Sequence, residues 1–162
     1  MSLTQLGTNS VEGCIAPGFH REVIQSIGTT ERQLKPEESG SLVLFDAASQ
    51  ITVRLPTPVA GMYFDFLCTV SVTASDTHKV ITKTIASEFM IGGIMSASLA
   101  VATSGDFFVA NGTTHVAIDQ NGSTTGGLVG GVFRLTAIST TQWGISGVNV
   151  GSGTNADPFA TS

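Results

Sequence analysis

The stretch GGLVGGVFRLTAI, residues 126–138, decides how this chain can fold, together with STT (139–141) and QWGISGV (142–148). Two runs rich in β-branched and aromatic residues flank a short Ser/Thr turn, which is typical of an antiparallel hairpin. Alternate apolar residues would share one face of each strand: Val129, Phe133, Leu135 and Ala137 in the first, Trp143 and Ile145 in the second. The paired glycines would let another backbone approach closely or let the strand bend.

Residues 62–72 carry the longest alternation of apolar and polar residues in the chain. One face would hold Met62, Phe64, Phe66, Cys68, Val70 and Val72. A period of two over eleven residues predicts a strand, because a helix repeats every 3.6 residues. We expect four aromatic side chains to be the structural anchors of the core: Trp143, Phe133, Phe64 and Phe66.

The remainder of residues 29–162 consists of short apolar runs separated by Gly, Asn, Ser and Asp. Asn111-Gly112 and Asn121-Gly122 are strong turn dipeptides. Short strands with turn signals between them, and no long helical pattern, predict an all-β fold. We expect a single domain of about nine or ten strands, built as a β-sandwich, a jelly-roll-like fold or a barrel.

Residues 1–28 differ from the rest, because their apolar side chains are isolated and follow no period. These side chains are Leu3, Leu6, Val11, Ile15 and Phe19. Such a segment buries little by itself, yet it is too apolar for a solvated linker. We interpret it as an extended N-terminal arm that becomes ordered on the surface of a partner.

The composition excludes several classes of function. The chain has 162 residues, of which 41% are hydrophobic and only 12% are charged, with a net charge of −5. Its seven basic residues are scattered, which argues against nucleic acid as a partner. No apolar run reaches the roughly 20 residues of a membrane-spanning helix, so we expect no membrane partner.

No pattern in the sequence indicates catalysis, a cofactor or a metal. The two cysteines, Cys14 and Cys68, carry no spacing signal, and we expect Cys68 to be a core residue. The three histidines lack the short spacing of a metal site. We therefore expect no enzyme, no catalytic residues, no metal ligands and no cofactor.

Six motifs, in this order and spacing, resemble structural proteins of tailed bacteriophages. They are EESG (37–40), ITVRLP (51–56), GMYFDF (61–66), NGSTTGG (121–127), WGISG (143–147) and GTNADPF (153–159). The resemblance covers residues 30–160 and points to the head decoration, or cement, proteins, which are often encoded beside the major capsid protein. The arm lies outside it.

The resemblance implies a virion protein on the capsid exterior, made in the host cytoplasm, that stabilises the capsid. Its partners would be the major capsid protein and two further copies of itself, in a homotrimer. The mode of attachment does not follow from the resemblance, and we expect the arm to bind the capsid because of its own isolated apolar residues, Leu3, Leu6, Val11, Ile15 and Phe19. The alternative is a head fibre or receptor-binding β module that recognises a glycan on the host surface.

Overall fold

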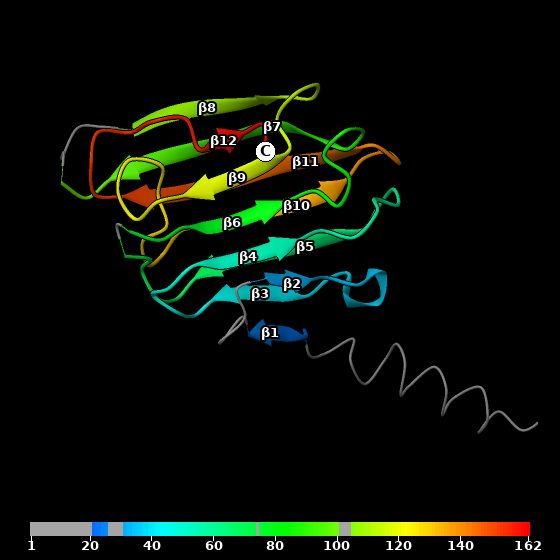
Figure 1. Ribbon diagram of the computed structural model, residues 1–162, viewed down its shortest axis with the longest axis horizontal. Coiled ribbons are helices and arrows are strands. Elements are labelled where there is room, and N and C mark those ends of the chain that lie inside the picture. The colour runs from blue at the N-terminus through cyan, green and yellow to red at the C-terminus, as the bar shows by residue number, and fades with distance from the viewer. Residues whose placement is uncertain (1–20, 26–30, 74, 101–104) are drawn as a thin grey trace, which may run out of the picture.

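The computed structural model describes residues 21–25, 31–73, 75–100 and 105–162, and twelve strands in these ranges form two sheets (Figure 1). Sheet A contains, in spatial order, β1 (Val23–Gln25), β3 (Leu42–Phe45), β5 (Tyr63–Cys68), β10 (Val132–Ala137), β11 (Gln142–Gly151), β7 (Phe89–Ser98) and β8 (Gly105–Asn111). Sheet B contains β12 (Phe159–Ala160), β9 (Ala117–Gln120), β6 (His78–Ile81), β4 (Ile51–Arg54) and β2 (Glu31–Gln33). One short 3-10 helix, Pro36–Glu38, precedes β3.

The all-β sandwich that the sequence predicts is confirmed, but the strand count of nine or ten is too low. The sequence pattern misses β1 and β12, which are three and two residues long. Strands this short hold too few residues to show an alternation. They pair at the ends of the two sheets, where β1 lies beside β3 and β12 lies beside β9.

The predicted hairpin forms the middle of sheet A. β10 and β11 pair in antiparallel fashion, with Trp143 opposite Ala137. β10 also pairs with β5, in antiparallel fashion, and β11 pairs in parallel with β7. The hairpin therefore joins the first three strands of sheet A to its last two, and the rest of the sheet is built outward from it.

The first six strands alternate between the two sheets along the chain. As a result β1, β3 and β5 lie parallel to one another in sheet A, and β2, β4 and β6 lie parallel in sheet B. This winding differs from the antiparallel Greek keys of a jelly roll and from a sheet closed into a barrel. Of the three architectures expected from the sequence, the sandwich is the one that describes the fold.

All four predicted anchors are buried between the sheets. Phe66 stacks on Phe133 with ring centroids 5.0 Å apart, and the rings of Phe64 and Trp143 are 6.2 Å apart. Cys68 is also buried, and burial raises the pKa of its thiol to about 11. These side chains come from three neighbouring strands, so the core is densest beneath the hairpin.

Two apolar residues that the alternation placed on the buried faces are exposed instead. Val70 lies beyond the end of β5, and Val129 lies before the start of β10. The sequence pattern therefore extends past the ends of both strands. Where pairing stops, the backbone turns and the alternation of buried and exposed side chains is lost.

A polar bridge ties the two sheets together at one end of the sandwich. Gln120 of β9 donates from its Nε2 to Oδ1 of Asn149 in β11, at 2.6 Å, and both side chains are buried. Asn149 donates in turn from its Nδ2 to the carbonyl of Thr125, also at 2.6 Å. Gly126 lies against this amide with φ +89°, and a Cβ there would overlap the Asn149 side chain.

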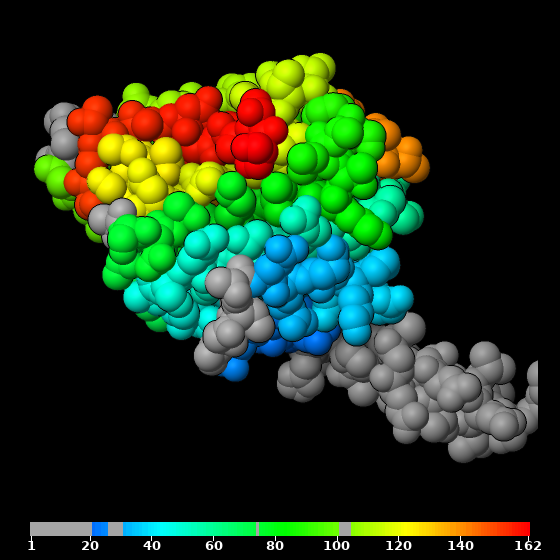
Figure 2. Space-filling model, in the orientation of Figure 1, coloured from blue at the N-terminus to red at the C-terminus, as the bar shows by residue number. Residues whose placement is uncertain are grey.

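The C-terminal residues close the edge of sheet B. β12 pairs with β9, and the ring of Phe159 stacks on that of His115 at 5.6 Å. Figure 2 shows this C-terminal segment, in red, against the yellow residues that include β9. The GTNADPF motif thus ends at the first residue of this short strand, Phe159.

The predicted N-terminal arm, residues 1–28, contains β1, which belongs to sheet A. The five predicted capsid-binding residues lie outside the described residues: Leu3, Leu6, Val11, Ile15 and Phe19. Any removal of the arm must therefore stop before Arg21 if sheet A is to keep its edge strand.

Candidate interaction surface

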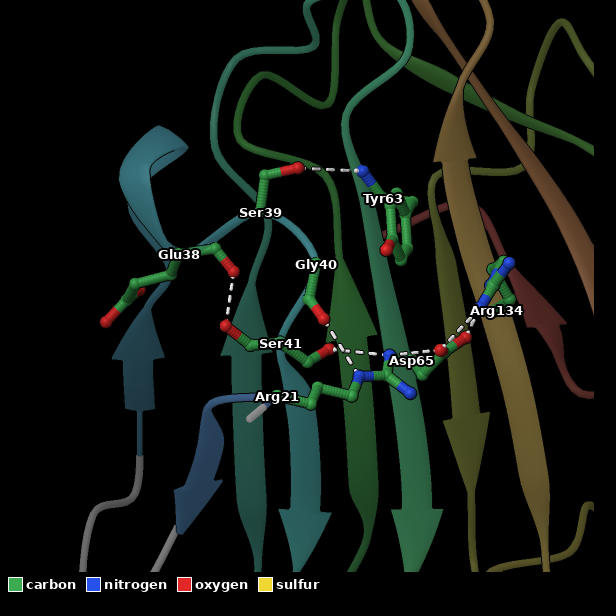
Figure 3. A network of polar contacts seen from close by, with 8 residues as sticks. All are labelled: Arg21, Glu38, Ser39, Gly40, Ser41, Tyr63, Asp65 and Arg134. Atoms are coloured by element: carbon green, nitrogen blue, oxygen red, sulfur yellow. Dashed lines mark hydrogen bonds and ion pairs between the residues drawn. The ribbon is translucent and has the colours of Figure 1, made fainter. Parts of the chain in front are cut away.

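An ion-pair cluster lies on the outer face of sheet A and is centred on Asp65 (Figure 3). Arg134 binds the carboxylate with two bonds, Nε to Oδ1 at 2.6 Å and a terminal nitrogen to Oδ2 at 2.7 Å. Arg21 also donates to Oδ2. Two guanidinium groups on one carboxylate hold Asp65 in its ionised form.

The strand register explains why these side chains meet. Asp65 of β5 is directly opposite Arg134 of β10, and both point away from the core. Directly opposite positions in antiparallel strands place oppositely charged side chains within contact distance. The Arg134 guanidinium also lies 4.7 Å from the centre of the Tyr63 ring, two residues along β5. This cation–π contact fixes the orientation of the arginine.

Arg21 fixes the start of the described chain on the same face. Its Nε donates to the carbonyl of Gly40 at 2.8 Å, and a terminal nitrogen donates to that of Ser41 at 3.1 Å. The side chain therefore crosses β3 to reach Asp65 on β5 (Figure 3). The described chain consequently begins, at Arg21, beside the outer face of sheet A.

The turn between β2 and β3 is held rigid at the rim of this face. The Glu38 carboxylate accepts from Arg32 at 2.6 Å and from the backbone N–H of Lys35 at 2.8 Å. Ser39 Oγ accepts from the backbone N–H of Tyr63 at 3.1 Å, and Ser41 Oγ donates to the Glu38 carbonyl. The EESG motif is thus a structural turn that supports the ion-pair cluster.

The Asp65 cluster makes the stability of the protein depend on pH. The hydrogen bonds from Arg134 lower the pKa of Asp65 below its ordinary value near 3.8, burial opposes this, and Arg21 lowers it further. A carboxyl whose pKa is lower in the folded state stabilises the fold above the unfolded value. This contribution is lost as the pH falls through the folded pKa.

We expect Asp65→Asn to lower the free energy of unfolding at neutral pH by about 1–2 kcal/mol, because two arginines lose their charged partner. The difference from wild type should shrink as the pH falls below 3.8. Urea unfolding at a series of pH values measures this difference in the free energy of unfolding. Asp119→Asn is the matched control, since Asp119 pairs only with Lys79 at 3.0 Å on sheet B and is more exposed. Equal losses in the two variants would contradict the account.

An apolar row crosses the same outer face beside the cluster. Opposite positions in the register place these residues in one line: Leu44, Leu67, Val132, Val148, Met95 and Phe107. The last four are 44%, 40%, 49% and 63% exposed. The Phe107 ring lies over Gly93, where a Cβ would overlap it. We call these six residues the apolar row.

Sheet B has an outer face of the opposite character. Four charged residues of its strands lie on this face, namely Glu31, Arg54, Lys79 and Asp119. Arg54 pairs with Glu31 at 2.9 Å and Lys79 pairs with Asp119 at 3.0 Å. Six strand residues of sheet A are large apolar side chains with high exposure, whereas the strands of sheet B hold none. This distribution of exposed apolar side chains favours sheet B as the solvent-facing side and sheet A as the contact surface.

Neither the ion-pair cluster nor the apolar row appears among the residues chosen from the sequence. The predicted anchors lie in the core, on the other side of the same strands. The sequence feature that could have identified Asp65 and Arg134 is a single charged residue at an outward position of an otherwise apolar strand. Only the register brings them together, because the two residues are far apart in the sequence.

In the part of the chain that the structure describes, no group of three His, Cys, Asp or Glu side chains could hold a metal ion. His78 is buried, stacks on Phe45 at 4.7 Å, and has its pKa lowered by that burial. No helix of the described ranges is long and apolar enough to cross a membrane.

Comparisons with known proteins give no relative. No protein-family model matches the chain, and no curated protein or solved structure matches it.

Proposed function

We propose that this chain is a structural virion protein that binds the outer surface of a tailed-phage capsid and stabilises it, as a homotrimer. The observation that carries the proposal is the contrast between the two outer faces. An apolar row beside a neutralised ion-pair cluster suits a surface covered by protein, and a sheet whose strands expose no large apolar side chain suits a surface exposed to water. The six motifs that resemble phage decoration proteins support the same assignment.

In this proposal residues 1–20 attach the protein to the capsid. Ordering a backbone costs roughly 1–2 kcal/mol per residue, so the arm orders only where burial offsets that cost. Each of its five apolar side chains would return about 1.5–3 kcal/mol when buried. Three arms on one trimer would bind with avidity, and binding only to the assembled shell would stabilise that shell.

We expect a variant that starts at Arg21 to keep its fold and oligomeric state but to lose capsid binding. Circular dichroism and light scattering check the first two properties. Co-sedimentation with undecorated capsids, assembled from the major capsid protein encoded with this chain, checks the third. Arg21 and β1 remain, so sheet A keeps its edge strand and its ion pair.

Two full-length variants distinguish the contribution of the arm's apolar side chains to capsid binding from the contribution of its length. One replaces Leu3, Leu6, Val11, Ile15 and Phe19 with serine and should bind as weakly as the truncated protein. The control replaces five polar residues of the arm with alanine, Thr4, Gln5, Thr8, Asn9 and Ser10, and should bind as wild type. If the truncated protein decorates capsids at wild-type concentration, the arm is not the attachment element.

The second candidate function is recognition of a host-surface glycan. The observation in its favour is Phe107, an aromatic side chain that is 63% exposed on edge strand β8. Aromatic rings in such positions stack on the apolar faces of sugars. Binding on a glycan array that Phe107→Ala abolishes, with no binding to capsids, would favour this function over capsid decoration.

A further inference from the structure

We propose that the outer face of sheet A is the surface through which copies of this chain associate. The inference rests on the proposed function, because it names the contact surface of the oligomer, but its test needs no capsid. The occupant is a second copy of the same chain. Three observations support this choice: the continuity of the apolar row, the pairing of the charges beside the row, and the area of the whole face.

The apolar row is continuous over six neighbouring strands. Val132 of β10 is opposite Val148 of β11, which is opposite Met95 of β7, which is opposite Phe107 of β8. Leu67 and Leu44 continue the line across β5 and β3. Sheets that pack face to face interdigitate such rows at a separation of about 10 Å. The outer face of sheet A thus has the form of an inner face of a sandwich.

The charges beside the row fit a copy of the same surface. A face that associates with itself must not carry an excess of one charge, because like charges would then meet. The charged residues next to the row are Asp65 and Arg134, which pair with each other, and Arg21, which pairs with Asp65. Glu22 lies beside them, 3.4 Å from Ser41 Oγ. With two acidic and two basic groups, the cluster neither repels its copy nor requires a charged partner.

A second line of residues beside the apolar row adds apolar side chains at its two ends. The positions beside the apolar row on β11 and β7 are Ser146 and Gly93, which are opposite each other. At the ends of the same line stand Val23 and Val109, which are 52% and 58% exposed. These apolar ends extend the contact surface beyond the single row.

The area of this face approaches that of a stable interface. Neighbouring strands are about 4.8 Å apart, so the seven strands span roughly 29 Å, and three rows cover roughly 14–20 Å along the strands. The product is on the order of 500 Å². A stable protein interface buries about 800 Å² per partner, so this face provides most of it.

The test is the oligomeric state of Val148→Glu, which places a charge at the centre of the row. Wild type should sediment at two or more times the chain mass of 16.7 kDa at micromolar concentration, and the variant at 16.7 kDa. Thr52→Glu is the matched control, because it adds the same charge to the outer face of sheet B, and it should sediment as wild type. Met95→Gln keeps the side-chain volume and should weaken association. If Val148→Glu does not fold, the oligomeric state of Met95→Gln tests the contact surface instead.

A wild-type chain that stays monomeric at micromolar concentration would overturn the inference. So would a folded Val148→Glu variant that keeps the wild-type mass. If that variant keeps its mass and loses capsid binding, the face contacts the capsid, and the proposed function stands while this inference is wrong. If the monomeric variant forms as expected but wild type does not bind capsids, the inference stands and the proposed function is wrong.

Discussion

Replacing Trp143 with alanine is expected to remove about 3–5 kcal/mol from the free energy of unfolding. Trp143 is fully buried in β11, at the start of the return strand of the central hairpin, and its ring lies 6.2 Å from that of Phe64. The cavity left behind would lie between β10 and β7, which both pair with β11. Since a domain is stable by only 5–15 kcal/mol, the variant should unfold far earlier or fail to accumulate.

Chemical denaturation followed by far-ultraviolet circular dichroism measures this loss without relying on tryptophan fluorescence. Trp143→Phe is a graded control and should lose less, because the phenyl ring fills part of the site. Val59→Ala, at an exposed position outside the strands and outside the proposed contact surface, should change the midpoint little. An unchanged midpoint for Trp143→Ala would show that the hairpin is not held by this ring.

The second large effect is expected at Gly126, where alanine should cost about 2–4 kcal/mol. Its φ of +89° lies in the left-handed region, and its Cβ would overlap the buried amide of Asn149. Moving that amide would break its bonds to Gln120 and Thr125, which tie the two sheets together. The variant should therefore lose stability for two separate reasons.

Gly130→Ala separates the two contributions to this loss. Gly130 has a φ of +95°, close to that of Gly126, but no atom lies within 4 Å of a Cβ placed there. Its substitution should cost only the backbone strain of about 1–2 kcal/mol. Thermal unfolding of both variants compares them directly. Equal losses would contradict a structural role for the Asn149 bridge.

The alternation of apolar residues predicted the central strands and their buried faces correctly. Phe64, Phe66 and Phe133 face the core, as a period of two requires. Alternation describes one strand at a time, however, and says nothing about which strand lies beside it. The parallel winding of the first six strands was therefore not predictable, because a strand looks the same in sequence whether its neighbour is parallel or antiparallel.

The interaction surface was missed for the same reason. Val132, Val148 and Met95 each look like an isolated apolar residue at an outward position, which is unremarkable in a β protein. Only the register places them in one line. Asp65 and Arg134 likewise form a pair only when β5 and β10 are neighbours.

Electron cryo-microscopy of capsids incubated with the purified protein tests the central claim most directly. The account predicts three copies at each decorated site, with their sheet A faces covered by protein, their sheet B faces toward solvent, and residues 1–20 against the shell. Undecorated capsids alone are the control. Sheet B packed against the shell with the apolar row facing water, or no added density at saturating protein, would contradict the account.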